Sequence, residues 1–221
     1  MSDLLYAWPE AARFGRTVPK ARFHDAGTIR SGLRERFTKE VGRITWAYKL
    51  AETTVNLRAS TDVPEIQVFE IEAKEDDVSD QVLAAIDRAV RTPILFEIGH
   101  GKDPDREVRM TATLKRLGTG VPKVGTYYTT SWQPVDTERR ALPASLTLAS
   151  LCGALVEPLT PLCARAGEDL SDLAARLDSV RALEREVASL EKKLRTEPQL
   201  NRKVELRRVL QSKQTELEEQ R

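Results

Sequence analysis

The stretch that decides the fold is PEIQVFEIEAKEDDVSDQVLAAIDRAVRTPILFEI, which runs from Pro64 to Ile98. Its first and last parts are rich in β-branched and aromatic side chains, which favour strands. The middle part places apolar residues at helical spacing, namely Val82, Leu83, Ile86 and Val90. The stretch therefore predicts a strand, an amphipathic helix and a second strand. Because both faces of the first strand contain apolar residues, we expect that strand to lie in the middle of a sheet.

Further elements are predicted on both sides of this stretch. A helix with Thr28 as its N-cap precedes two strands, residues 44–50 and 53–57, which form a hairpin-like pair. Two strands that alternate polar and apolar residues follow, at 108–115 and 124–132. The resulting order is α-β-β-β-α-β-β-β, which predicts a mixed α/β core of the α+β type over residues 1–135.

The composition changes after residue 132. All twelve aromatic residues precede Gln133, and the remainder is rich in helix-forming residues, which predicts a helical extension over residues 136–221. Apolar residues recur there at steps of three and four, as in the seam of a coiled coil. This seam consists of Leu170, Leu173, Leu177, Val180, Leu183, Val187, Leu190 and Leu194. Pro198 predicts a kink or a hairpin. A lone helix cannot bury such a seam, so the seam residues are candidates for a partner interface.

The charges are nearly balanced, with 35 Lys and Arg against 34 Asp and Glu, so binding to nucleic acid needs a local basic patch. The segment from Arg13 to Phe23 interleaves cations with aromatic residues, and its candidates for phosphate contact are Arg13, Arg16, Lys20 and Arg22. No apolar run approaches the roughly 20 residues of a membrane span. The N-terminus has no apolar signal segment, so we expect a cytoplasmic protein.

One triplet suggests a chemistry. Glu72 and Lys74 lie two residues apart on one strand, as a metal-binding carboxylate and a water-activating lysine do in restriction-type nucleases. A second acid would come from Glu52 or Asp62. This alternative requires Mg²⁺, and no other cofactor is expected. The non-catalytic interpretation of the same triplet is that the end of the strand meets solvent and its charged side chains form an ion pair with a neighbouring strand. The two histidines and two cysteines lack zinc-ligand spacing.

Four runs resemble a known family: ITWAYKLAETTVNL, VPEIQVFEIEAK, AAIDRAVRTPILFEI and LRTEPQLNRKVELRRVLQ. They are similar to the uncharacterised bacterial domain-of-unknown-function family numbered four-three-nine-one. The sequence departs from the family pattern at Pro198 and at Arg207 and Arg208. The resemblance implies a gene setting beside helicases and DNA methyltransferases in defence loci.

The function that we expect is accordingly that of an accessory subunit of a bacterial, anti-phage defence assembly. It would dock on a larger protein such as a helicase or a methyltransferase, with a second copy of the chain as another occupant of the seam. The alternatives are the Mg²⁺-dependent nuclease and a nucleic-acid-binding module without catalysis.

Overall fold

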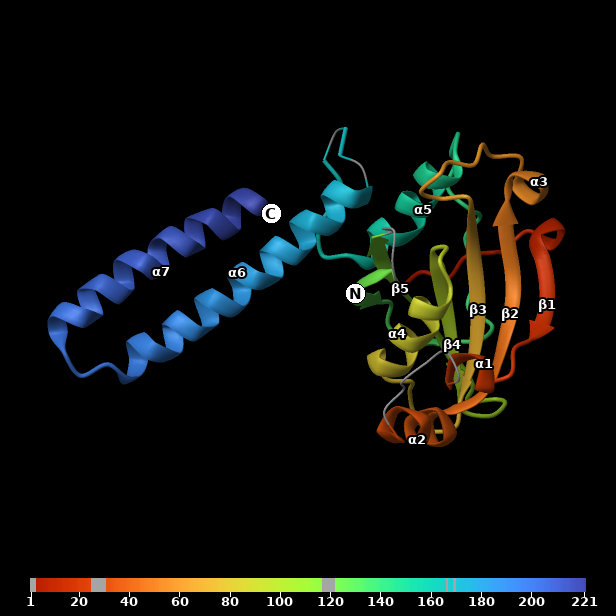
Figure 1. The fold of residues 1–221 in the computed structure, drawn as a ribbon, viewed down its shortest axis with the longest axis horizontal. Coiled ribbons are helices and arrows are strands. Elements are labelled where there is room, and N and C mark those ends of the chain that lie inside the picture. Colours follow the sequence, from red (N-terminus) through yellow and green to blue (C-terminus); the bar gives the residue numbers. More distant parts are fainter. Residues whose placement is uncertain (1–2, 25–30, 117–121, 166, 169) are drawn as a thin grey trace. The chain divides into compact units, whose positions relative to one another are not determined.

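The computed structural model describes residues 3–24, 31–116, 122–165, 167–168 and 170–221. The chain divides into two compact units, Met1–Cys163 and Ala164–Arg221. The first unit is a mixed sheet with short helices, and the second is a pair of long helices (Figure 1). The predicted mixed α/β class with a C-terminal helical part is confirmed. The division falls later than residue 135 because α5 (Leu148–Val156) packs on strands of the sheet.

The sheet has the strand order β1-β2-β3-β4-β5-β6, with β7 paired to β5. The pair β3 and β4 is parallel, with Phe69 opposite Phe96, and the other pairs are antiparallel. The helix α4 (Asp80–Ala89) connects the two parallel strands, as the sequence predicts. The strands are β1 (Arg13–Thr17), β2 (Val41–Ala51), β3 (Glu65–Ala73), β4 (Ile94–His100), β5 (Glu107–Arg116), β6 (Lys123–Thr129) and β7 (Gln133–Pro134).

The predicted hairpin of strands 44–50 and 53–57 is wrong. β2 is a single long strand that pairs with β3, and the short helix α3 (Glu52–Val55) follows it. The Thr54 hydroxyl accepts a hydrogen bond from the Ala51 amide at 2.9 Å and donates to the Lys49 carbonyl at 2.9 Å, which stabilises the start of this turn. Asn56 then ends it in the left-handed conformation, at φ 53°.

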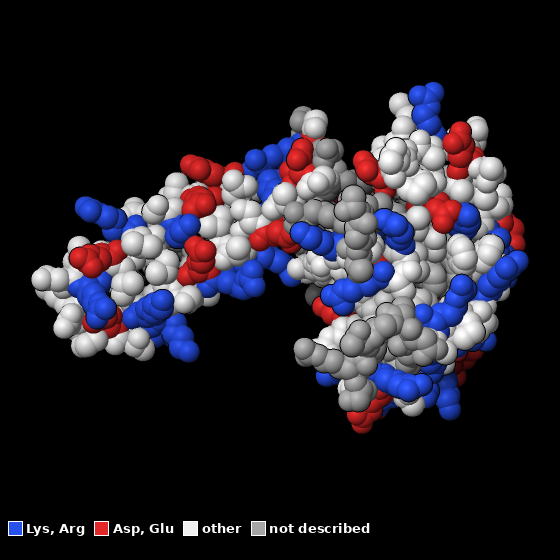
Figure 2. Space-filling model, viewed as in Figure 1, with Lys and Arg blue, Asp and Glu red and all other residues white. Residues whose placement is uncertain are grey.

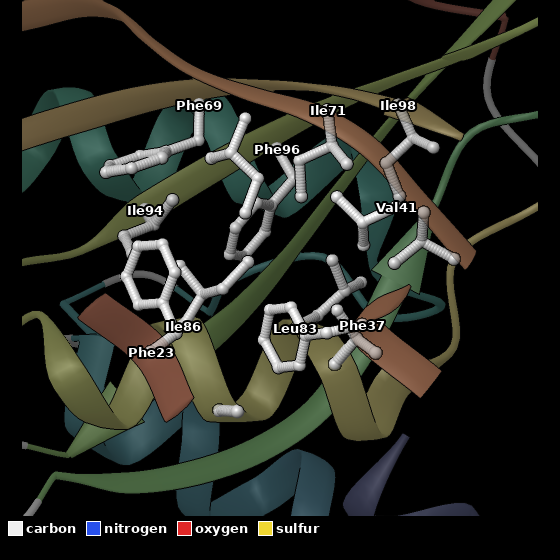
Figure 3. Close-up of a cluster of buried hydrophobic side chains, with 14 residues drawn as sticks. Phe23, Phe37, Val41, Phe69, Ile71, Leu83, Ile86, Ile94, Phe96 and Ile98 are labelled. Carbon is white, nitrogen blue, oxygen red and sulfur yellow. The ribbon is translucent and has the colours of Figure 1, made fainter. Parts of the chain in front are cut away.

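Three helices cover one face of the sheet, namely α1 (Ala21–His24), α2 (Ser31–Glu40) and α4. Thr28, the predicted cap of α2, lies outside the described residues. Figure 3 shows Phe23, Phe37, Leu83 and Ile86 from these helices facing a row of strand side chains. The strand side chains are Val41, Phe69, Ile71, Ile94, Phe96 and Ile98. Each such burial stabilises the fold by about 1.5–3 kcal/mol.

The second face is covered differently. Ile66 and Val68 alternate with Phe69 and Ile71 along β3, so they point to the opposite side, where α5 packs. The 3-10 helix η2 (Glu157–Leu159) follows α5, and a second one, η1 (Glu10–Ala12), precedes β1. The N-terminal segment pairs with residue 140 through the hydrogen bonds from the Ala7 amide to the Arg140 carbonyl and from the Arg140 amide to the Leu5 carbonyl, both 2.8 Å.

The second unit is an antiparallel hairpin of α6 (Leu170–Thr196) and α7 (Leu200–Gln220), with Pro198 in the connection (Figure 1). Ion pairs join Glu186 to Lys213 at 3.3 Å and Glu184 to Arg221 at 3.1 Å. The predicted break at Pro198 is therefore a hairpin. No helix in the described ranges is both long enough and apolar enough to cross a bilayer.

The seam of α6 is mostly covered within the chain. Its buried residues are Leu173, Leu177, Val180 and Leu183, and its half-buried residues are Val187, Leu190 and Leu194. The side chain of Leu170 lies outside the described part. The helix α7 contributes Leu206, Leu210 and Leu217 as its least exposed leucines, at steps of four and seven. The seam is therefore occupied as far as Leu183 and only partly open beyond it.

Candidate functional site

The predicted nuclease carboxylate Glu72 lies near the end of β3, between two guanidinium groups. Its Oε1 atom is 2.6 Å from Arg43 Nη2 and 3.9 Å from Arg106 Nη2. Arg43 is the register partner of Glu72 on β2, so this is an ion pair across strands. Two arginines occupy the surroundings that a metal ion would need, and the donor set therefore does not fit Mg²⁺.

The two further acids lie elsewhere. Glu52 follows β2 directly after Ala51, whose register partner is Glu65, whereas Glu72 pairs with Arg43 at the other end of the strand. The seven steps along the strand from Glu65 to Glu72 correspond to about 23 Å. Asp62 also precedes β3 at the Glu65 end. The structure does not bring Glu52 or Asp62 to Glu72, and the described ranges contain no group of three His, Cys, Asp or Glu residues placed to hold a metal ion.

The predicted catalytic lysine has a structural contact. Lys74 Nζ donates a hydrogen bond to the Thr38 carbonyl at 2.6 Å, and Lys20 Nζ donates to the Val41 carbonyl. Both carbonyls belong to the end of α2 or directly follow it, where carbonyl groups have no partner within the helix and cations are favourable. The two ammonium groups thus cap α2. Burial lowers the pKa of Lys20, and the nearby charge of Lys74 lowers it further.

The four predicted phosphate contacts differ in their surroundings. Arg13 lies 3.2 Å from Glu10, and Lys20 is engaged at α2. Arg16 is exposed and stacks over the Phe14 ring at 4.7 Å, and Arg22 is exposed on α1. β1 is an edge strand, and cations on such a strand discourage pairing with other chains.

The structure brings out a different group on the face of the sheet opposite α4. Glu70 is the only exposed residue of β3, although β3 is flanked by strands on both sides. Its register partner on the parallel strand β4 is Glu97, which is 4% exposed. Trp8 and Tyr48 lie beside these carboxylates, with ring centroids 6.1 Å apart. We call Trp8, Tyr48, Glu70, Glu97 and Arg139 the Glu70 surface.

The buried carboxylate of this surface is fully engaged. Arg139 donates two hydrogen bonds to Glu97, at 2.7 and 3.0 Å, and Trp8 Nε1 donates a third at 2.6 Å. Arg139 also donates to the Tyr6 carbonyl at 2.9 Å, so the same guanidinium fixes the N-terminal segment. A bidentate arginine and an additional donor therefore supply this buried carboxylate with the hydrogen bonds that it needs.

Glu70 itself is not engaged. Within the described residues, its carboxylate makes no hydrogen bond and has no cation within 4.0 Å. Partial desolvation against the sheet raises its pKa, and the negative charge of Glu97 raises it further, while Arg139 and Arg106 lower it in part. A carboxylate without a cationic partner can accept a hydrogen bond from a cation, or it can exchange a proton. A hydrogen bond from a cation would supply the partner that Glu70 lacks among the described residues.

The sequence contains a signal for this surface that the motif analysis missed. Glu70 and Glu97 are acidic residues inside the apolar runs QVFEI and ILFEI. A carboxylate in a central strand needs a partner or a function. Their side-by-side placement depends on the register of β3 and β4, and Arg139 comes from a distant segment.

The match to a known protein family extends along nearly the whole chain. A family model described as Domain of unknown function (DUF4391) matches residues 7–217, nearly the whole chain. The chain belongs to the DUF4391 family. The matched residues of this DUF4391 protein include most of both units and the whole Glu70 surface. No curated protein and no solved structure matches the chain.

Proposed function

We propose that this DUF4391 protein is a non-catalytic interaction subunit that docks on a larger protein through the Glu70 surface. Glu70 accepts hydrogen bonds from a basic side chain of the partner. The observation that supports this most is the exposed and unpaired carboxylate in a central strand, beside Glu72 and Glu97, which both have arginine partners. A partner cation would complete the pattern.

The surroundings of Glu70 suit a cationic side chain. Tyr48 and Trp8 are half-buried and offer aromatic faces beside the carboxylate, and a guanidinium stacks on such faces while it donates to an acid. Arg139 and Arg106 are already directed to Glu97 and Glu72. The aromatic rings provide apolar contact area, and Glu70 provides specificity for positive charge.

A binding function also agrees with the roles of the other candidate groups. Lys74 caps α2, and Glu72 lies between two arginines, so neither is placed to activate water. The helical seam is less suited to docking than its sequence indicates, because α6 already buries four of its residues. The family resemblance points to a helicase or a methyltransferase of a bacterial defence system as the partner.

The test is the affinity of the full chain for the helicase or methyltransferase encoded in the same locus. Loss of a charge-assisted hydrogen bond costs about 1.5–3 kcal/mol, so Glu70→Gln should weaken binding by about 10- to 100-fold. The matched control is Glu35→Gln, which removes an exposed carboxylate from α2 and should leave the affinity unchanged. Equal affinities of the wild type and Glu70→Gln, or absence of binding to both enzymes, would contradict the proposal.

A further inference from the structure

The connected ends of α6 and α7 contain a concentration of positive charge. Between residues 192 and 208 there are seven cations and two carboxylates, in a chain whose net charge is only +1. The cations are Lys192, Lys193, Arg195, Arg202, Lys203, Arg207 and Arg208, and we call them the basic tip. Figure 2 shows Lys and Arg side chains around these ends of the two helices.

These cations are available to a ligand. Six of the seven are exposed, and Lys203 is half-buried. Within the described part of the chain, only Arg202 has a carboxylate within reach, since Glu197 lies 4.0 Å away. At the other end of the hairpin the cations are paired, as Lys213 is with Glu186 and Glu216, and Arg221 with Glu184 and Glu218. The two ends of the hairpin therefore differ in how far their cations are paired, and both ends belong to the second unit.

The spacing of the cations fits a duplex backbone. The first eight residues of α7 rise about 12 Å, and α6 contributes Lys192, Lys193 and Arg195 beside them. A duplex has one negative charge for about 1.7 Å of its axis, so a 12 Å length presents about seven phosphates. Arg207 and Arg208 can each hold a phosphate through two parallel hydrogen bonds.

Other anionic partners fit less well. A membrane surface requires a wide apolar face opposite the cations, and the exposed apolar residues near the tip are only Leu200, Val204 and Val209. An extended acidic peptide presents at most one carboxylate for about 3.3 Å of its length, which is about half the charge density of a duplex. We propose that the basic tip binds the phosphate backbone of duplex nucleic acid, without reading its sequence. This proposal is independent of the Glu70 surface.

The experiment measures binding of the full chain to a labelled DNA duplex of about 20 base pairs, from about 50 to 200 mM salt. The tip variant replaces Lys193, Arg195, Arg207 and Arg208 with Gln. The control variant removes the same number of exposed cations from the first unit, at Arg34, Arg88, Lys102 and Lys123. Far-UV circular dichroism verifies that the helices of both variants are intact.

If four tip cations contact phosphates, log affinity should fall with log salt at a slope of about −3.6, and affinity should drop about 100-fold over this range. The tip variant should lose most of the binding and most of the slope, while the control stays within about threefold of the wild type. A duplex of different sequence should bind equally. Equal loss in both variants, a salt-independent affinity, or equal binding to anionic vesicles or polyglutamate would overturn the proposal.

A third variant separates the two basic regions. Arg16→Gln with Arg22→Gln removes two exposed cations of the N-terminal segment and leaves Arg13, which is paired with Glu10. We expect it to bind like the wild type. Loss of binding in this variant alone would place the contact on β1 and α1 and would contradict the assignment to the tip.

Discussion

Removal of the Lys115 ammonium should destabilise the first unit more than most other single substitutions. Lys115 Nζ lies 2.7 Å from Asp87 Oδ1, and the two side chains are 1% and 0% exposed. The ammonium also donates to the carbonyls of Asp87, Val90 and Thr92, at 3.1, 2.9 and 2.7 Å. It therefore pairs a buried acid and caps the end of α4. Burial raises the pKa of Asp87 and lowers that of Lys115, so each charge depends on the other.

The size of the expected loss of stability follows from the buried Asp87 carboxylate, which would lose its cation. Lys115→Met leaves a buried carboxylate without its cation, which costs about 3–5 kcal/mol. Domains of this kind have only about 5–15 kcal/mol of stability in total. At about 2–4 °C for each kcal/mol, the melting temperature should fall by roughly 6–20 °C.

The assay is urea unfolding followed by tryptophan fluorescence. All three tryptophans, Trp8, Trp46 and Trp132, belong to the first unit, so the signal excludes the hairpin. The control, Lys39→Met, removes an ammonium whose side chain is 69% exposed and should cost about 0.5 kcal/mol or less.

A combined variant tests the reasoning. The Tyr127 hydroxyl donates to the Asp87 carboxylate, so Lys115→Met is combined with Asp87→Leu and Tyr127→Phe. The triple variant should be more stable than the single one, because it removes the isolated charge together with its remaining donor. A cost below about 1 kcal/mol for Lys115→Met, or a triple variant less stable than the single, would refute this account.

Two further predictions follow. Hydrogen bonds from Arg176 hold the pKa of Glu168 at about 2, against an ordinary 4.5, so this carboxylate stabilises the hairpin above pH 4.5 and loses its effect as the pH falls towards 2. The difference in melting temperature between the wild type and Glu168→Gln, followed by circular dichroism at 222 nm, should therefore shrink over that interval, and a constant difference would contradict it. Burial raises the pKa of Cys152 to about 12, whereas Cys163 is exposed. Maleimide should accordingly modify the native protein once, at Cys163, and modification of Cys152 at a similar rate would contradict its burial.

The sequence pattern predicted correctly those helices and strands whose local preference agrees with their burial in the fold. The stretch from Pro64 to Ile98 has strand and helix periodicities that burial in the sheet reinforces, and β3, α4 and β4 form as expected. Thr53, Thr54 and Val55 are β-branched and favour a strand in isolation. Instead, the side-chain hydrogen bonds of Thr54 and the turn at Asn56 end β2. The spacing of apolar residues in the sequence does not predict such contacts.

The functional surface depends on contacts between distant segments. Glu72 and Lys74 have the spacing of a catalytic motif, but their contacts are determined elsewhere in the fold. Lys74 contacts the end of α2, and Glu72 contacts Arg43 of β2 and Arg106 directly before β5. Glu70 and Glu97 become neighbours only through the parallel register of β3 and β4. Trp8 and Arg139 reach Glu97 across 89 and 42 residues of sequence. The basic tip could be read from composition, although its free cations become evident only once the hairpin is formed.

Hydrogen–deuterium exchange on the complex with the co-encoded helicase or methyltransferase tests the central claim most directly. We predict slower exchange in the N-terminal segment at Trp8, around Tyr48 and around Arg139, and loss of this protection when Glu70→Gln is used at the same concentrations. Unchanged exchange at these three positions, with protection confined to α6 and α7, would show that the partner docks on the hairpin and would contradict the role assigned to Glu70.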